Sequence, residues 1–236
     1  MRNLNSEISI LKIDPKKIRA YTVFPWTQIL DYFEEDETVT TQFPSILGLD
    51  PSLTNLGFAS ISSKSKTEIS IPEVGTISLK SKSTDRLKHF VSILPYLLLK
   101  YMPNVVVVED YAYGASNKSH QIGELGGLVR LVIAEYSEVI NQFCLSIFLS
   151  PTQVKKFATG VGNSKKNIML MHMFKQFGIE LKDDNQADAF YLAAMGSLKT
   201  YKSLLGHKLK DLELTESQQK IISDLRFNKQ EEPVSI

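Results

Sequence analysis

The stretch ILGLDPSLTNLGFASIS, residues 46–62, decides the fold because it places two strand patterns on either side of a turn. Ile46–Leu49 and Gly57–Ser62 are apolar or small, and the Pro, Ser, Thr and Asn residues between them favour a turn. The first strand ends at Asp50. A carboxylate in an apolar setting is costly unless something pairs with it, so this stretch predicts two adjacent strands with a functional acid where the chain turns.

Length and composition predict one hydrophobic core with an appendage, in a protein of the cytoplasm. The chain has 236 residues, of which 43% are apolar and 22% are charged, and this is enough to bury one good core. No apolar run reaches the roughly 18 to 20 residues that cross a bilayer, and the first ten residues lack the pattern of a signal peptide. The single cysteine, Cys144, excludes an internal disulfide and a cysteine-built zinc site.

The chain divides into three segments of different character. Residues 1–44 are mixed, with an acidic run, and are predicted to form an N-terminal extension of unknown role that holds some strand and a short helix at 26–33. Residues 45–200 are predicted to form one compact domain. Residues 201–236 are polar and are predicted to form a C-terminal tail that is helical at 215–225.

Positive charge is unevenly spread along the chain, although the formal net charge is only +1. Residues 46–200 hold 16 basic and 13 acidic residues, and the basic residues form two clusters. Such clusters are either solvated surfaces or contacts for a polyanion, and their position beside a buried-acid pattern favours the polyanion. The clusters are Lys80, Lys82, Arg86 and Lys88, and then Lys155, Lys156, Lys165 and Lys166.

The middle segment alternates strands and helices in an order that predicts an α/β fold. After the first two strands, the sequence predicts strands at 73–79, 105–108 and 144–149, and helices at 84–101, 119–136, 187–198 and after Ser150 and Asn163. Three consecutive strands predict an antiparallel meander, and helical crossovers lead to the last two strands. The result is a mixed five-stranded sheet flanked by helices, which is the arrangement of the ribonuclease H-like fold.

Acidic residues end two of these strands, Asp50 the first and Glu109 the fourth. In a sheet of this order the two strands are neighbours, and functional sites collect at the carboxyl ends of such strands. Two carboxylates brought together there repel and shift toward protonation, a conflict that a divalent cation with oxygen ligands resolves. The pair therefore predicts a metal site.

A third acid is predicted on the last helix. Asp188 lies among apolar and small residues, where a lone carboxylate needs a partner. Asp184 lies four residues earlier on the same helical face, although it can equally serve as the N-cap of the helix. Asp183 and Asn185 are further candidates, and spacing alone does not separate the three.

Lysines lie beside the predicted helix starts. Lys165 and Lys166 open a helix, where backbone amides and positive side chains together attract phosphate. Lys155 or Lys156 follows the Ser-Pro-Thr-Gln start of the preceding helix. The alternative interpretation of these lysines is a solvated helix face.

Four blocks occur in a fixed order along residues 45–198: GLDPSLTNLGFA, VVVVEDYAYG, LSPTQVKKFATGVGNSKKNIM and DDNQADAFYLAA. They resemble the four blocks of the RuvC-type Holliday-junction resolvases. The resemblance implies the ribonuclease H-like fold, in a divergent member whose added N-terminal segment suits a phage or a mobile element. It further implies a magnesium-dependent endodeoxyribonuclease that acts as a homodimer on branched DNA, especially four-way junctions, with dimer contacts on the Gly-rich helix at 123–131.

The resemblance also assigns metal ligands. Asp50, Glu109 and Asp188 match catalytic ligands of the family. A fourth ligand usually lies three residues before the last aspartate, and that position is Asn185 here. This departure makes Asp184 the expected substitute, with Asp183 as the alternative.

The DNA-binding residues follow from the same resemblance. Lys155 and Lys166 match basic residues near the scissile phosphate, and their neighbours Lys156 and Lys165 complete the basic set. Tyr111 and Tyr113 lie near the aromatic wedge of the family, and packed tyrosines are the alternative interpretation of this pair.

Together these roles predict a two-metal hydrolysis of the phosphodiester. Two Mg²⁺ ions, for which Mn²⁺ can substitute, would be held by Asp50, Glu109, Asp184 and Asp188 and would activate water and stabilise the leaving 3′ oxygen. Lysines would neutralise charge in the transition state, and a C2 dimer would make paired symmetric nicks with 5′-phosphate and 3′-hydroxyl ends. Two alternatives stay open: a non-catalytic branched-DNA-binding relative, and a ribonuclease H-like nuclease or transposase-type enzyme with another substrate.

Overall fold

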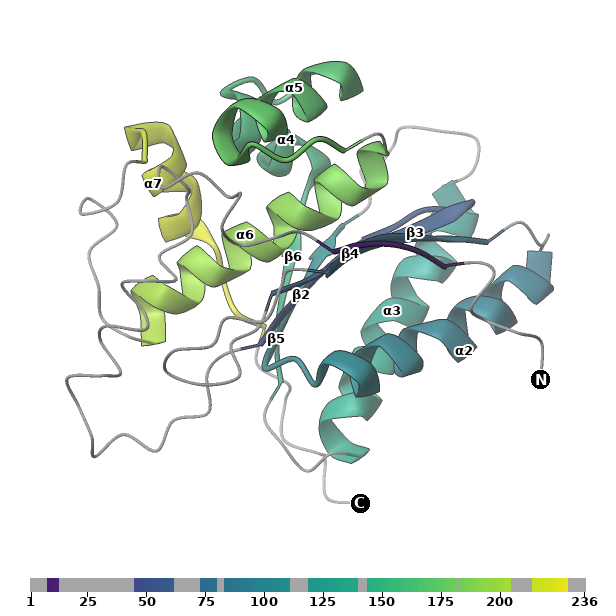
Figure 1. Ribbon diagram of the computed structural model, residues 1–236. Helices are drawn as coiled ribbons and strands as arrows, with labels where there is room; N and C mark the ends of the chain where they lie inside the picture. Colours follow the sequence, from purple (N-terminus) through teal and green to yellow (C-terminus); the bar gives the residue numbers. More distant parts are fainter. Residues whose placement is uncertain are drawn as a thin grey trace.

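The computed structural model describes residues 8–12, 45–61, 73–79, 83–110, 119–139, 144–181, 183–204 and 214–228. Its centre is a mixed β-sheet with helices on both faces (Figure 1). The strands are β1 (Ile8–Lys12), β2 (Ile46–Pro51), β3 (Asn55–Ile61), β4 (Glu73–Ser78), β5 (Val105–Glu109) and β6 (Leu145–Leu149), in the spatial order β1-β4-β3-β2-β5-β6.

Strand pairing confirms the predicted mixed sheet. β2, β3 and β4 form the antiparallel meander, and β5 and β6 add to β2 in parallel. The five predicted strands are all present. A sixth strand, β1, comes from the N-terminal segment and pairs antiparallel with β4 at the sheet edge, and the short helix predicted at 26–33 lies outside the described residues.

Six helices flank the sheet in the described part of the chain: α2 (Ser83–Tyr101), α3 (Ser119–Val139), α4 (Pro151–Thr159), α5 (Lys166–Phe177), α6 (Asp184–Leu204) and α7 (Glu216–Asp224). α4 begins with a capping box, in which Ser150 and Gln153 satisfy each other's backbone amides, and it ends at Gly160 in the left-handed conformation. The described residues include no helix long and apolar enough to cross a membrane.

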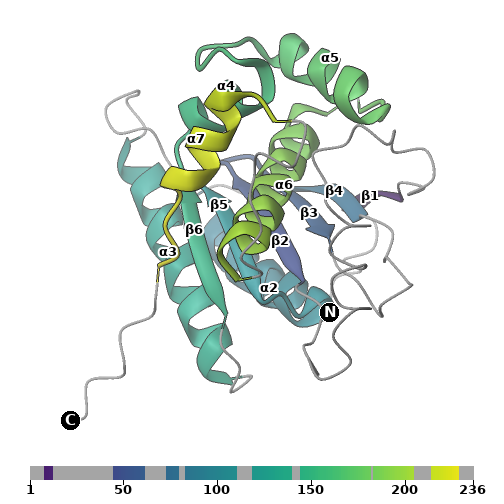
Figure 2. The same ribbon diagram turned by 90° about the vertical axis from the view of Figure 1, so that its left-hand side faces the viewer.

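Each face of the sheet carries its own hydrophobic core. α2 and α3 cover one face and α6 the other, with α4, α5 and α7 around α6 (Figures 1 and 2). Alternation along the strands assigns the residues to these cores, because successive side chains point to opposite faces. In β5, Val106 and Val108 pack with α2 and α3, whereas Val105 and Val107 pack with α6.

Glycines let α6 lie directly on the sheet. A Cβ at Gly48 of β2 would lie 2.2 Å from the carbonyl oxygen of Ala189, and one at Gly57 of β3 would lie 2.3 Å from that of Asn185. Gly196 of α6 approaches Val107 in the same way. The start of α6 is therefore held against the ends of β2 and β3.

The C-terminal segment packs against the domain through α7. The helix predicted at 215–225 is present and begins with a capping box formed by Thr215 and Gln218. Its buried residue Ile222, and Leu225 directly after the helix, belong to the core that includes α6. Beyond α7, Asn228 forms an isolated antiparallel bridge with Ser146 of β6, at the edge of the sheet opposite β1.

Candidate active site

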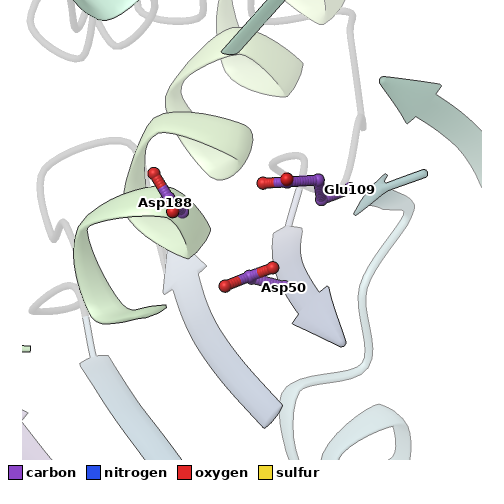
Figure 3. Close-up of side chains that lie close together, drawn as sticks. All are labelled: Asp50, Glu109 and Asp188. Carbon is purple, nitrogen blue, oxygen red and sulfur yellow. The ribbon is translucent and has the colours of Figure 1, made fainter. Parts of the chain in front are cut away.

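Three carboxylates meet at one end of the sheet. Asp50 lies near the end of β2, Glu109 ends β5, and Asp188 lies in the first two turns of α6. Their side chains point toward a common space (Figure 3), and one oxygen atom of each lies within 4.8 Å of the others. The fold therefore brings together three of the predicted acids, from positions that are 59 and 79 residues apart along the chain.

Strand alternation explains why these side chains meet. Leu47 and Leu49 of β2 point into the core beneath α2 and α3, so Asp50 points to the opposite face, toward α6. Glu109 continues the row of Val105 and Val107, which also faces α6. Because β2 and β5 are adjacent and parallel, their carboxyl ends lie at the same edge of the sheet.

Burial and mutual repulsion make the cluster unfavourable when all three groups are charged. Burial, with added repulsion from Asp188, raises the pKa of Asp50 to about 7. Burial, followed by repulsion from Asp50 and Asp188, raises the pKa of Glu109 to about 9. Burial also raises the pKa of Asp188 to about 6. A compensating positive charge among the three carboxylates would remove this cost.

The donor set fits a hard divalent cation. Oxygen ligands from a few carboxylates are what Mg²⁺ and similar ions use in proteins. Oδ1 of Asp188 is buried and has no hydrogen-bond partner among the described residues. Such an unpaired buried oxygen is costly, and coordination to a cation shared with Asp50 and Glu109 would satisfy it.

Two lysines place positive charge beside the cluster. The charge of Lys155 on α4 opposes the effect of burial on the pKa of both Asp188 and Glu109. Lys166, the first residue of α5, forms a hydrogen-bonded ion pair with Asp184. The hydrogen bond to Asp184 raises the pKa of Lys166. Lys156 and Lys165 are exposed, on α4 and at the N-cap of α5.

The other predicted acids at the start of α6 have different partners. Asp184 pairs with Lys166 and is outside the cluster of three carboxylates. Oδ1 of Asp183 accepts hydrogen bonds from the backbone amide of Asn185 at 2.9 Å and from Asn185 Nδ2 at 2.7 Å. Asp183 thus caps α6, and the assignment of Asp184 as a metal ligand stays a prediction.

Two predicted residues lie outside the described chain, and one contact was missed. Tyr111 and Tyr113 fall in the segment 111–118, between β5 and α3, which the structure does not describe.

Thr76 of β4 donates a hydrogen bond to Oδ2 of Asp183. A threonine in a strand carries no signal of its own, but the strand register would have located it, because Gly57 pairs with both Asp50 and Thr76.

Known proteins resemble this chain in sequence over the segment that holds the three carboxylates. The family model described as crossover junction endodeoxyribonuclease RuvC matches residues 46–195. The RuvC protein of Rickettsia typhi is 32% identical over 154 residues, which are 63% of this chain and 93% of that protein. The RuvC protein of Prochlorococcus marinus strain NATL2A is 28% identical over 155 residues, or 64% and 96% of the two chains.

A solved structure supports the same fold. Thermus thermophilus RuvC superposes with a TM-score of 0.50 and 20% identity, covering 69% of this chain and 96% of that one. The match to the family model includes Asp50, Glu109 and Asp188, whereas β1 and α7 lie outside it. The resemblance seen in the four sequence blocks is therefore confirmed over more than half of the chain, and the chain belongs to the crossover junction endodeoxyribonuclease RuvC family.

Proposed function

We propose that this protein is a metal-dependent endodeoxyribonuclease that resolves four-way DNA junctions. The observation that carries the proposal is the convergence of Asp50, Glu109 and Asp188 within the segment that matches the family. The curated relatives are named crossover junction endodeoxyribonucleases. The cytoplasm of a bacterial host or of a phage-infected cell is the proposed location.

The three carboxylates would hold the metal. Magnesium is the proposed ion, with manganese as a substitute and two ions in each site. Bound divalent cations supply an activated water and charge stabilisation at the leaving 3′ oxygen. Asp188 contributes an oxygen that lacks another partner, and Asp50 and Glu109 contribute carboxylates that are costly to ionise without a cation.

The lysines would act on the phosphate. Lys155 is half-buried and its charge lowers the pKa of both Glu109 and Asp188, so we assign it to the charge that develops on the scissile phosphate. Lys166 stands at the start of α5, where helix amides also favour an anion. The exposed Lys156 and Lys165 are suited to neighbouring phosphates of the backbone, where contacts position the DNA without reading its sequence. Tyr111 and Tyr113 remain the candidates for the wedge.

A homodimer is part of the proposal. A four-way junction has approximate two-fold symmetry, so a C2 pair of protomers places two sites for paired cuts. α3 is the proposed contact helix. Its residue Leu131 is 54% exposed, and a Cβ added at Gly123 or Gly127 would meet nothing within 4 Å. This leaves room on α3 for close approach of a second copy.

The proposal is tested by incubating the protein with a synthetic immobile four-way junction and Mg²⁺ or Mn²⁺. Asp50→Asn and linear duplex DNA are the controls. We expect paired, symmetric nicks on the junction that disappear in the variant. Binding without cleavage would identify a non-catalytic branched-DNA-binding relative, and equal cutting of linear duplex would leave only a nuclease of this fold with another substrate.

A further inference from the structure

A chain of hydrogen bonds joins the helix that carries Asp188 to the helix that carries Lys155. The hydroxyl of Tyr191 on α6 donates to Oε1 of Gln176 on α5 at 2.9 Å. Nε2 of Gln176 then donates to the carbonyl oxygen of Ala158 on α4 at 3.1 Å. Because a backbone carbonyl can only accept, the Gln176 amide must turn its nitrogen to α4 and its oxygen to Tyr191.

The first member of this chain is rigidly placed. Tyr191 is fully buried, and its ring meets Phe177 edge-on with 5.8 Å between the centroids. It lies three residues after Asp188, so the two side chains leave neighbouring parts of the α6 surface. A buried hydroxyl requires a partner, and Gln176 supplies it. The position of Gln176 is therefore fixed relative to Asp188.

The last turn of α4 is held mainly from outside the helix. The final carbonyls of a helix have no intrahelical partner. In α4 the carbonyl of Lys156 accepts from Gly160, that of Phe157 accepts from Nε2 of Gln218 on α7 at 3.0 Å, and that of Ala158 accepts from Gln176. α4 has only nine residues, so anchoring this end also sets the position of Lys155, one turn away.

We propose that Tyr191 and Gln176 are positioning residues that hold Lys155 of α4 in place beside Asp188 and Glu109. The inference rests on the proposed nuclease function and adds residues that touch neither metal nor DNA. The position of Lys155 agrees with it, because its charge lowers the pKa of both carboxylates in this structure. Gln218 supports the same end of α4 from a helix outside the family match.

The test is Tyr191→Phe, which keeps the buried ring and removes only the hydroxyl. Single-turnover cleavage of a four-way junction should slow by about fivefold to tenfold, the effect of losing roughly one hydrogen bond in the organised site. Junction affinity measured in Ca²⁺ and Mn²⁺ affinity measured by calorimetry should both stay within about twofold of the native values, since Tyr191 contacts neither the DNA nor the metal. Gln176→Met keeps a side chain of similar length but removes its amide, and it should have the same effects as Tyr191→Phe.

Tyr136→Phe is the matched control. Tyr136 is also a buried tyrosine, but it lies on α3, beneath the opposite face of the sheet, and its hydroxyl lies 3.8 Å from Met102 Sδ. Its cleavage rate should equal that of the native chain. A similar loss in Tyr136→Phe would mean that the rate reports general loosening of the core and would overturn the proposal.

A double variant shows whether the effect passes through Lys155. In a Lys155→Ala background, adding Tyr191→Phe should cause no further loss of rate, because the group that Tyr191 positions is already gone. Full additivity, or an unchanged rate in Tyr191→Phe and Gln176→Met alone, refutes the positioning role. Failure of the native chain to cut any junction would instead refute the proposed function, so the two failures are distinct.

Discussion

Gly48 of β2 lies directly beneath Ala189 of α6, so closely that a Cβ on the glycine would be 2.2 Å from the alanine carbonyl oxygen. Asp50 follows Gly48 by two residues on the same face of the strand, and Asp188 precedes Ala189 on the helix. This contact therefore sets the distance between two of the three clustered carboxylates. The backbone, rather than the acids themselves, brings the cluster together.

Gly48→Ala should weaken metal binding without changing any ligand. The added methyl forces α6 away from β2, and overpacking of this kind typically costs about 1 to 3 kcal/mol of stability. Mn²⁺ calorimetry should show a clear loss of affinity. Gly123→Ala is the control, since a Cβ there meets nothing within 4 Å and should leave Mn²⁺ affinity unchanged. Equal affinity in both variants would contradict the role given to this contact.

Asp50→Asn should stabilise the metal-free protein while it abolishes metal binding. The pKa of Asp50 is raised from 3.8 to about 7, chiefly by burial, so ionising it at pH 8 costs the folded state free energy. Neutralising the group should raise the free energy of unfolding by an amount on the order of 4 kcal/mol in urea titrations at that pH. Asp224→Asn on the exposed end of α7 should change it by less than about 0.5 kcal/mol.

The stability of the metal-free protein should fall as pH rises. For Asp50 and Glu109 the folded-state pKa lies above the ordinary value, so the folded chain binds protons more tightly than the unfolded chain. Their contribution is present in full below about pH 4 and is lost as pH passes through about 7 and then about 9. Tm measured across pH 5 to 9 should show this decline.

Two further measurements check the cause of that decline. Mn²⁺ should raise Tm more at high pH than at low pH, because the metal competes with protons for the same oxygens. The double variant Asp50→Asn, Glu109→Gln should lose most of the pH dependence and the response to Mn²⁺. If the double variant keeps the slope of the native chain, groups elsewhere are responsible.

Asp184→Asn separates two roles for this residue. Asp184 is a predicted ligand that pairs with Lys166 and lies outside the carboxylate cluster, so we expect its removal to lower Mn²⁺ affinity far less than removal of Asp188, by about threefold. Asp188→Asn, the matched change one turn along α6, should abolish detectable binding, since an uncompensated loss at a buried ligand is severe. A loss in Asp184→Asn as large as that in Asp188→Asn would identify Asp184 as a ligand after all.

Leu131→Glu should produce a monomer. The change replaces an exposed apolar side chain of the proposed α3 contact with a charge, which association with a second copy would have to bury. Light scattering after size exclusion should give about half the native mass, with helix content unchanged by circular dichroism. Glu135→Gln, another exposed position on α3, should leave the mass unchanged. A native chain that is already monomeric would remove the dimer from the proposal.

The sequence predicted most of the sheet because its signals are local. The apolar runs that end in Asp50 and Glu109 have the length and composition of buried strands, and neighbouring parallel strands necessarily bring their ends together. Asp188 was identified because a lone acid among alanines, phenylalanine and leucine lacks a local explanation. These arguments need no knowledge of distant contacts.

Long-range contacts were the part that spacing could not supply. Helical periodicity places Asp184 and Asp188 on one face, but the partner of Asp184 is Lys166, which belongs to another helix. The hydrogen bond between Tyr191 and Gln176 also joins two helices, and no sequence pattern in either helix predicts it. β1 pairs with β4 across more than sixty residues, and such register depends on the whole sheet.

β1 and Asn228, from the N-terminal and C-terminal segments, lie at opposite edges of the sheet, where they can limit self-association. β1 covers the β4 edge of the sheet, and Asn228 occupies part of the β6 edge. An uncovered edge strand offers free amides and carbonyls to any other chain and is a common start of aggregation. Shortening the protein to the segment shared with its relatives, residues 46–195, would therefore keep the three carboxylates, make the longer β4 the edge strand in place of β1, and uncover β6 at Ser146. Aggregation of the shortened protein should then appear while the carboxylate cluster is still intact.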